Sequence, residues 1–237
     1  MPDFKIADIE VTLVDSMGSD LSVVNAARVS FDKESDWDRV DVVPSHFTDY
    51  DTQPVLKEAD AKLINYLAKH NHWTPFGHAF ASFRIKAPFF VARQLGKHQV
   101  GLVWNEVSRR YVDSEPEFYF PEVFHSRSEN VKQGSDEKPA ELKNEGTEYP
   151  TLSYLVESSL RAYKGLLNDG VAPEDARMFL PACTMTEWIW SGSLAAFSRV
   201  CKLRLDPHTQ YQTRSVAEKI DQEMVQLFPV SWKALQE

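Results

Sequence analysis

The segment that organises this chain spans residues 88–112 and reads PFFVARQLGKHQVGLVWNEVSRRYV. It carries the cations Arg93, Lys97, His98, Arg109 and Arg110, and amide, carboxylate and hydroxyl side chains stand between them. A solvated basic helix followed by a polar turn would also be cationic. Such a surface has no need of interleaved Asn, Glu, Ser and Tyr side chains. The mixture therefore favours a binding pocket over a merely exposed face.

The composition of the whole chain indicates what kind of ligand this segment binds. The 237 residues are 43% hydrophobic and include six Trp and fourteen Phe, which is ample for a packed core. The formal net charge of −9 opposes binding of nucleic acids or anionic membranes through the field of the whole protein. A cluster of arginines in an acidic protein therefore indicates a pocket for a small anion such as a phosphate.

The cysteines and the hydropathy pattern bear on the compartment. Cys183 and Cys201 lack CxxC spacing and are too few for a disulfide framework, which fits a reducing cytoplasm. Residues 1–20 lack the basic start and apolar run of a signal peptide, and no stretch approaches 18 apolar residues. We therefore expect a cytoplasmic protein that does not span a membrane.

Hydrophobic periodicity predicts a mixture of long helices and a few strands. Period-two patterns predict strands over residues 5–14, 79–86, 117–124 and 184–190. Helical periodicity and end signals predict helices over residues 20–27, 55–70, 88–98, 152–167, 173–180 and 194–203, and one that opens at Asp206 and runs through Leu227. Because strands and helices do not strictly alternate, the pattern indicates an α+β fold.

Two segments lack clear periodicity. Residues 32–53 are acidic and carry Pro44, and residues 126–148 are charged and contain Gly134, Pro139 and Gly146. Both are predicted to be surface loops or insertions in a single domain that spans residues 1–237. Residues 191–193 are predicted to form a turn that also supplies a helix N-cap, and Asp20 is predicted to be the N-cap of the helix over 20–27.

Three further places could carry chemistry: Ser30, the run HNHWTPFGH at 70–78, and RLDPHTQ at 204–210 together with Arg177. Arg204 and His208 flank the predicted start of the last helix, where backbone N–H groups favour an anion. On the residues alone, an ordinary ion pair for Arg204 and a surface position for His208 are equally acceptable.

Several other chemistries are disfavoured. His70, His72 and His78 have no carboxylate nearby and cross a helix–strand junction, so no metal is expected there. Neither cysteine has a paired base in its sequence context, as a thiol nucleophile would need. The phosphate-binding patterns GxGxxG and GxxxxGK[ST] are both absent.

Four blocks of the sequence resemble, in the same order, those of the flavin-dependent thymidylate synthases. RQLGKHQVGLVWNEVSRRY at 93–111 resembles the family signature RHRxxSxNExSxRY. AARVSFD at 26–32, TPFGH at 74–78 and LRLDPHTQ at 203–210 resemble its other blocks. The likeness spans most of the chain apart from residues 32–53 and 126–148. It implies an α+β fold in which an antiparallel-type sheet is flanked by long helices.

The resemblance also implies a reaction, its cofactors and an assembly. Members of that family make dTMP from dUMP for dTTP biosynthesis. Methylenetetrahydrofolate supplies the carbon, and FAD reduced by NADPH supplies the reducing equivalents. They are homotetramers whose active sites are shared between subunits. Their chemistry uses no cysteine nucleophile, in keeping with Cys183 and Cys201.

By position, the resemblance implies a nucleotide set and a flavin set. Arg204 is implied as the catalytic residue, because a fixed cation in a dry pocket would stabilise a developing uracil anion. Bidentate hydrogen bonds would explain the use of arginine at the phosphate. The implied dUMP contacts are Arg93, Gln94, Glu106, Ser108, Arg109, Arg110, Arg177 and Arg204. The implied FAD contacts are Ser30, Thr74, Lys97, His98, Gln99, Glu106, Ser193, Arg199 and His208.

The sequence departs from the family pattern mainly at the flavin contacts. Arg-His-Arg of the signature reads Lys97, His98 and Gln99 here, and one extra residue lies between His98 and Asn105. Lys97 lacks the planar fork of arginine, and Gln99 carries no charge. Gly77 stands where an acidic residue is frequent, and the positions that commonly hold flavin-binding Asn and Arg are Ser193, Ala195 and Arg199.

Two alternatives of other classes remain open. The departures at the flavin positions would also suit a non-catalytic dUMP-binding homologue that has lost the flavin. A single-stranded nucleic-acid binder could stack bases on Trp104 and Tyr111 within the basic segment. The net charge of −9 weighs against the second.

Overall fold

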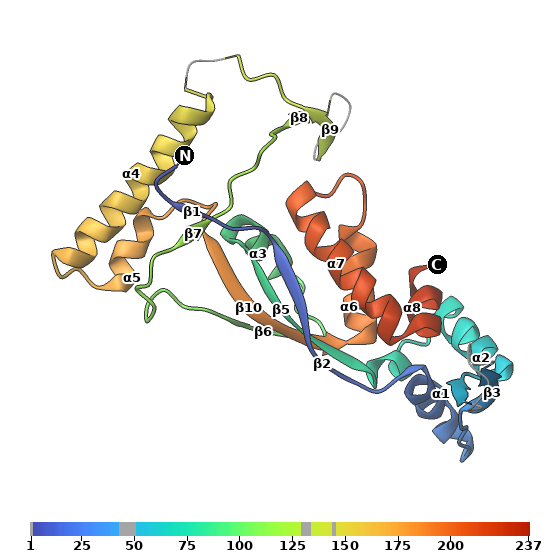
Figure 1. Ribbon diagram of the computed structural model, residues 1–237. Coiled ribbons are helices and arrows are strands. Elements are labelled where there is room, and N and C mark those ends of the chain that lie inside the picture. Colours follow the sequence, from blue (N-terminus) through green and yellow to red (C-terminus); the bar gives the residue numbers. More distant parts are fainter. Residues whose placement is uncertain (1, 43–50, 129–133, 144–145) are drawn as a thin grey trace.

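A four-stranded antiparallel sheet forms the centre of the molecule (Figure 1). The computed structural model describes residues 2–42, 51–128, 134–143 and 146–237. The predicted α+β fold is confirmed. The strand order is β2-β5-β10-β6, with β2 at Glu10–Met17, β5 at Phe80–Pro88, β10 at Met185–Ser193 and β6 at Leu102–Glu106.

Alternation along the two inner strands creates one buried face. On β5, Phe83 and Ile85 are fully buried, and on β10 Trp188 and Trp190 are buried opposite them. The intervening side chains point to the other face, where the hydroxyls of Ser82 and Ser191 lie 2.8 Å apart. The sheet is therefore apolar toward the helices and polar on its outer face.

The predicted strands over 79–86 and 184–190 are confirmed, but β10 runs further than expected. Residues 191–193, predicted as a turn, continue the ladder, and Gly192 pairs with Ala81 on one side and Leu102 on the other. Ser193 is still an N-cap, because its Oγ accepts a hydrogen bond from the backbone N–H of Ala196 at 3.3 Å. The strand β6 was not predicted, since its polar residues mask the alternation.

The apolar face of the sheet packs against helices from distant parts of the chain. Phe197 of α6 makes edge-to-face contacts with Phe83 at 5.2 Å and Trp190 at 5.4 Å between ring centroids. Val216 and Ile220 of α7 join the same core. The elements are α3 at Phe89–Leu95, α6 at Leu194–Arg204, α7 at Tyr211–Leu227 and α8 at Pro229–Gln236.

Two helix ends on this side of the sheet differ from the sequence prediction, and one helix was missed. The predicted helix over 88–98 ends at Leu95, because the chain turns at Gly96. The last predicted helix begins at Tyr211 instead of Asp206, since the backbone N–H groups of His208 and Thr209 bond back to Asp206 and form a turn. Helix α8 was not predicted.

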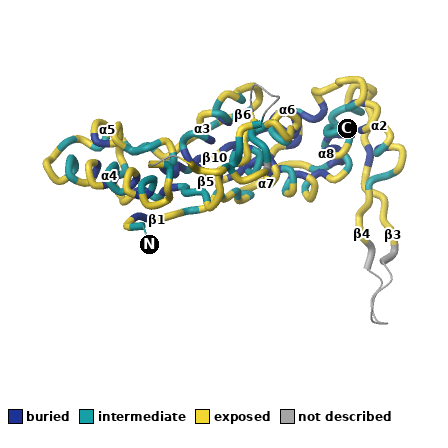
Figure 2. The backbone as a smooth tube through the Cα atoms, turned by 90° about the horizontal axis from the view of Figure 1, so that it is seen from above, coloured by how far each residue is buried: buried dark blue, intermediate teal, exposed yellow. Residues whose placement is uncertain are grey.

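One end of the molecule holds α1 (Asp20–Arg28), η1 (Val29–Phe31), α2 (Glu58–Lys69) and η2 (Thr74–Gly77). Residues 32–53, predicted as a surface loop or insertion, contain two strands in their described part, so the loop alternative is wrong there. Strands β3 (Asp38–Val42) and β4 (Asp51–Val55) pair there as a hairpin, which projects from the body in Figure 2. Residues 43–50 lie outside the described residues. Strand β4 also moves the start of the predicted helix 55–70 to Glu58.

The opposite end is built on α4 (Tyr149–Asn168), α5 (Pro173–Ala176) and η3 (Arg177–Phe179), which confirms the helices predicted over 152–167 and 173–180. A second apolar cluster there joins Phe4, Phe118, Leu160 and Tyr163. The predicted strand over 5–14 is broken into β1 (Lys5–Ile6) and β2, and β1 pairs in parallel with β7 (Glu117–Phe118). The strand predicted over 117–124 is therefore only two residues long.

The predicted loop over 126–148 contains a second hairpin, made by β8 (His125–Arg127) and β9 (Ser135–Pro139). This part of the loop prediction is wrong. The hairpin lies near the N-terminal end of α7 (Figure 1). Residues 129–133 and 144–145 are outside the described residues. No helix in the described ranges is both long and apolar enough to cross a membrane.

Candidate active site

A pocket of about 300 Å³ opens between α3 and the edge strand β6. It brings together side chains that were predicted for both ligands: Arg93 for dUMP, His98 and Gln99 for FAD, and Glu106 for both. The remaining lining residues are Phe89, Ala92, Gly96, Leu102 and Trp104. The segment 88–112 therefore folds back on itself around a cavity, as its mixed composition suggested.

The return of the chain from α3 to β6 depends on a tight turn. Gly101 has φ +75°, a left-handed conformation that favours glycine, and a Cβ atom there would lie 3.2 Å from the Cβ of Ala196. The residues between His98 and Asn105, where this sequence is one residue longer than the family pattern, form this turn and the start of β6. The insertion is thus placed beside the pocket.

Arg204, the last residue of α6, is held by two groups from the quoted segment. Its Nε donates to Nε2 of His98 at 3.0 Å, and its Nη2 donates to the backbone carbonyl of Gln94 at 3.4 Å. Burial lowers the pKa of the Arg204 guanidinium. Burial, and then the positive charges of Arg204 and Arg199, lower the pKa of His98. The imidazole is therefore a neutral acceptor that fixes the direction of the guanidinium.

Gln94 is oriented by residues of α7 and the loop before it. Its Oε1 accepts a hydrogen bond from the buried Thr213 hydroxyl at 3.1 Å, and its Nε2 donates to Oε1 of Gln210. Gln210 stands in the LRLDPHTQ block, but it was not predicted as a site residue. Thr213 gave no signal at all, because it is 119 residues from Gln94 in sequence.

Glu106 is fixed by neighbours in the sheet. Its Oε1 accepts from the Thr186 hydroxyl at 2.7 Å, and its Oε2 accepts from the indole N–H of Trp104 at 3.2 Å. The Trp104 ring stacks on Trp188 with the centroids 4.3 Å apart and the planes at 17°. The position of the carboxylate is thus set by the register of β6 on β10.

The other predicted flavin residues surround a second pocket or lie outside both. Arg199 donates to the carbonyl of Val100 at 2.7 Å and lines a pocket of about 250 Å³ that also contains Trp73, the neighbour of Thr74. Ser30 on η1 and Lys97 line neither pocket. His208 is exposed, with its Nδ1 3.0 Å from Asp206 Oδ1.

The remaining predicted nucleotide residues are spread along the molecule. Arg109 lines a separate pocket of about 200 Å³ and donates to the carbonyl of Ser114 at 2.9 Å. The Nε of Arg110 donates to Ser108 Oγ at 3.3 Å. Arg177 sits on η3, where its Nε donates to the carbonyl of Glu174 at 3.3 Å. A single chain therefore does not gather the whole predicted dUMP set.

The two cysteines are unsuited to nucleophilic chemistry. Burial raises the pKa of the Cys201 thiol strongly and that of Cys183 as well. A thiol that resists ionisation is a poor nucleophile. In the part of the chain that the structure describes, no three His, Cys, Asp or Glu side chains converge as a metal ion would require.

Known proteins match this chain over nearly its whole length. A family model described as thymidylate synthase complementing protein matches residues 12–230. The flavin-dependent thymidylate synthase of Thermus thermophilus is 37% identical over 227 residues, covering 96% of this chain and 75% of its own. That of Kosmotoga olearia is 35% identical, covering 94% of this chain and 88% of its own.

Solved structures give the same picture. The UMP/dUMP methylase PolB from Streptomyces cacaoi, bound with 5-Br dUMP, superposes with a TM-score of 0.78 and 27% identity over 98% of this chain and 96% of that one. Its complex with 5-Br UMP gives a TM-score of 0.76, also at 27% identity, over 99% and 97%. The similarity therefore includes the helical ends of the molecule as well as the central sheet.

Proposed function

Because this chain belongs to the thymidylate synthase complementing protein family, with the flavin-dependent thymidylate synthases as relatives, we propose that it methylates dUMP reductively to dTMP for dTTP synthesis. Methylenetetrahydrofolate is the carbon donor and NADPH the source of reducing equivalents. The observation that carries the proposal is Arg204, a partly buried cation aimed by His98 and Gln94 beside a pocket lined by Arg93 and Glu106.

Arg204 is the proposed catalytic residue. A guanidinium that is already fixed can stabilise negative charge as it develops on the uracil ring without having to reorganise. The neutral His98 accepts from Nε and leaves other N–H groups of Arg204 available to the base. Arg93 and Gln94 contribute binding and orientation, and Arg93 suits the nucleotide phosphate.

The residues around the turn at 96–101 fit a flavin dinucleotide. Pockets adjoin this turn on the side of Gln99 and on the side of Arg199, whose guanidinium bonds Val100. Arg199 and Lys97 supply the positive charge that a diphosphate needs, although Lys97 lacks the fork of arginine. FAD, when bound, would supply the redox chemistry. Ser30, Thr74, Ser193 and His208 complete the proposed flavin set.

We further propose a cytoplasmic homotetramer with shared active sites. Arg177 on η3 and Ser108, Arg109 and Arg110 after β6 do not line the pocket that contains Arg93. If a second copy contributes these residues, the nucleotide gains cations that lie outside the Arg93 pocket of a single chain. In such an assembly, predicted site residues that lie apart in one chain would each contact the nucleotide.

A second candidate substrate follows from the solved relatives, since PolB is described as a methylase of both UMP and dUMP. The assay should therefore present UMP and dUMP separately under identical conditions. We expect dUMP to be the better substrate. A higher kcat/KM for UMP would transfer the assignment to ribonucleotide methylation.

The direct test is anaerobic incubation of purified protein with dUMP, methylenetetrahydrofolate and NADPH. We expect yellow protein whose flavin absorption bleaches with NADPH, and formation of dTMP. Absence of dTMP would reject the proposed reaction. Colourless protein that binds dUMP and takes up no FAD would support the non-catalytic alternative.

The role of Arg204 is tested by Arg204→Ala, with Arg39→Ala on the β3–β4 hairpin as a control. Loss of preorganised charge stabilisation should lower kcat by about 10²–10³-fold, while flavin content and melting temperature stay close to those of the parent. Arg39→Ala should leave turnover unchanged. Comparable turnover in the two variants would remove Arg204 from the catalytic role.

A further inference from the structure

The β8–β9 hairpin contacts the loop that joins α6 to α7, residues 205–210. Gly134, directly before β9, has φ +99°, and a Cβ atom there would lie 2.8 Å from the carbonyl oxygen and 3.1 Å from the Cα of His208. Two independent constraints therefore require glycine at this position: the left-handed backbone and the closeness of the His208 backbone.

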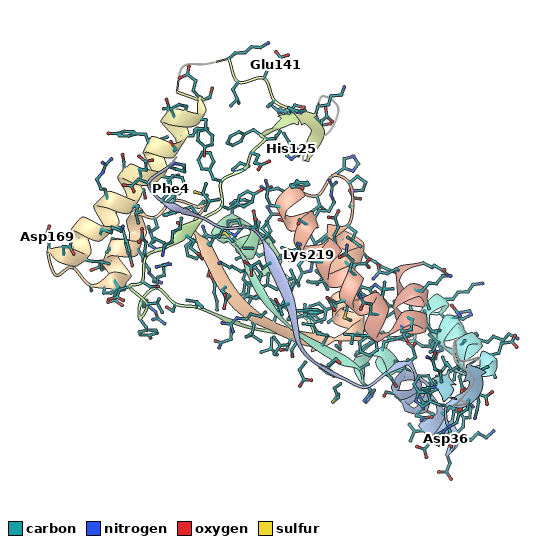
Figure 3. All side chains as sticks on the ribbon, viewed as in Figure 1. Phe4, Asp36, His125, Glu141, Asp169 and Lys219 are labelled. Atoms are coloured by element: carbon teal, nitrogen blue, oxygen red, sulfur yellow. The ribbon has the colours of Figure 1, made fainter. Side chains whose placement is uncertain are left out.

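The hairpin makes a second contact at the other end of the same loop. The rings of His125 and Tyr211 are tilted by 38° with their centroids 4.9 Å apart. Tyr211 is the first residue of α7, and Figure 3 shows His125 beyond that end of the helix. The contacts at His208 and Tyr211 bracket Thr209 and Gln210. A pocket of about 500 Å³, lined in part by His125, Gly134 and Gln210, adjoins this contact.

The loop at residues 205–210 connects groups that face the proposed nucleotide site. Arg204 immediately precedes it, and Gln210 ends it with a hydrogen bond to Gln94. Within the loop, the Thr209 hydroxyl donates to the carbonyl of Leu203 at 3.2 Å. Asp206, Pro207 and His208 are exposed, so much of the loop surface is open to solvent. A contact that fixes the His208 backbone thus limits the motion of a segment tied at both ends to site residues.

We propose that the β8–β9 hairpin is a positioning element for the nucleotide site and that Gly134 is its main positioning residue. This inference rests on the proposed function, because it assigns the loop to dUMP binding. The hairpin holds the His208 backbone and the start of α7, and the loop in turn keeps Gln94 and Arg204 in register. Gly134 acts through the loop and touches no reacting atom.

The chain offers a matched pair of glycines for the test. Gly146 has φ +90° and nothing within 4 Å of an added Cβ, whereas Gly134 meets the His208 backbone. Gly134→Ala and Gly146→Ala therefore both place alanine at a positive φ, but only the first brings a Cβ atom against the loop backbone. Hydrogen exchange of the peptide covering residues 205–211 should accelerate in Gly134→Ala and stay at the parental rate in Gly146→Ala.

The kinetic consequence should appear in the nucleotide. For Gly134→Ala we expect kcat/KM for dUMP to fall about tenfold through a small displacement of binding groups, mainly as a higher KM. Equal loop exchange and equal KM in the two glycine variants would overturn the proposal.

A second pair of variants avoids backbone strain and decides the question if Gly134→Ala does not fold. His125→Ala removes the ring contact with Tyr211, and His125→Phe retains it. We expect faster loop exchange and a higher KM for dUMP in the alanine variant, with recovery in the phenylalanine variant. Parental behaviour of His125→Ala would count against the hairpin. A parent that makes no dTMP refutes the proposed function, while the exchange measurement still judges the hairpin contact.

Discussion

At the scale of single residues, Asp20 shows how one carboxylate joins the two ends of the chain. It is buried, and its oxygens accept from the backbone N–H groups of Val230 at 3.0 Å and Ser231 at 2.8 Å. The sequence suggested Asp20 as the cap of the helix that it begins. That prediction is wrong, because Ser19 occupies the N-cap of α1, and Asp20 instead caps α8.

Replacement of Asp20 should therefore loosen the C-terminal helix. Asp20→Ala leaves two backbone donors at the start of α8 without this acceptor, and we expect a loss of about 1–2 kcal/mol in the free energy of unfolding. Asp20→Asn keeps one acceptor oxygen and should lose less. Urea titration of both variants provides the measurement. Equal stability of Asp20→Ala and the parent would show that the cap does not contribute to the free energy of unfolding.

The interaction between His98 and Arg204 should make the protein sensitive to acid. The pKa of His98 in the folded chain lies below its ordinary value of 6.5, so folding opposes its protonation. The stabilisation is accordingly complete above pH 6.5 and is lost as the pH falls through the folded-state pKa. Protonation also removes the acceptor at Nε2 that aims Arg204.

We expect NMR titration to place the midpoint of His98 below 6.5, and the melting temperature to fall in that acidic range. His98→Gln, which cannot titrate, should weaken this dependence. The variant is needed because the chain contains seven histidines. A midpoint above 6.5 would contradict the burial and the charge environment described for this ring.

At the scale of elements, the contact between β10 and β6 depends on a missing side chain. A Cβ atom at Gly192 would lie 2.5 Å from Cδ2 of Leu102 and 2.7 Å from the carbonyl oxygen of Gly101. Gly101 directly precedes β6 and Leu102 begins it, and this strand carries Trp104 and Glu106. The shape of the pocket therefore depends on a glycine in the inner strand β10.

Gly192→Ala should cost about 1–3 kcal/mol through overpacking and should weaken ligand binding as β6 is displaced. Gly165→Ala is the matched control, because Gly165 lies inside α4 with nothing within 4 Å of an added Cβ. The control should gain about 0.5–1 kcal/mol from helix propensity. Chemical denaturation of the two proteins gives both values, and a Gly192→Ala variant as stable as the control would refute the packing argument.

The elements that could be predicted were those with a strong internal pattern. Helices α2 and α4 and strand β5 followed directly from their apolar stripes, because local periodicity and burial agree there. The hairpin β3–β4 was missed because it is short and acidic, with its apolar side chains Val40 and Val55 exposed. Its strands pair with each other and bury little against the body, so burial left no periodic signature.

At the scale of the whole molecule, the sequence resemblance names candidate site residues but does not give their arrangement in space. Arg93, His98 and Glu106 meet in one pocket, as adjacent positions in one motif suggested. The support of Gln94 by Thr213 could not be predicted, because it arises from the docking of α7 on α3. Arg177 lies on the far helical end, a separation that no linear motif encodes.

The proposed sharing of active sites between subunits predicts complementation between inactive variants. Arg177→Ala and Arg204→Ala should each be nearly inactive as pure proteins. After the two are mixed, unfolded and refolded together, some sites would combine intact Arg177 from one chain with intact Arg204 from another, and turnover should return to about a quarter of the parental value by random assembly of subunits. A mixture that remains inactive would indicate that each chain builds its own site.

The stacked tryptophans beside the pocket have an optical consequence. Trp104, Trp188 and Trp190 are in ring contact, Trp104 lines the cavity, and the chain has six tryptophans. Much of the ultraviolet emission of the molecule thus originates within reach of any chromophore bound there. An isoalloxazine absorbs where indole emits, so its arrival would quench that light by energy transfer. The fluorescence of these tryptophans therefore reports flavin binding in the native chain without an added label.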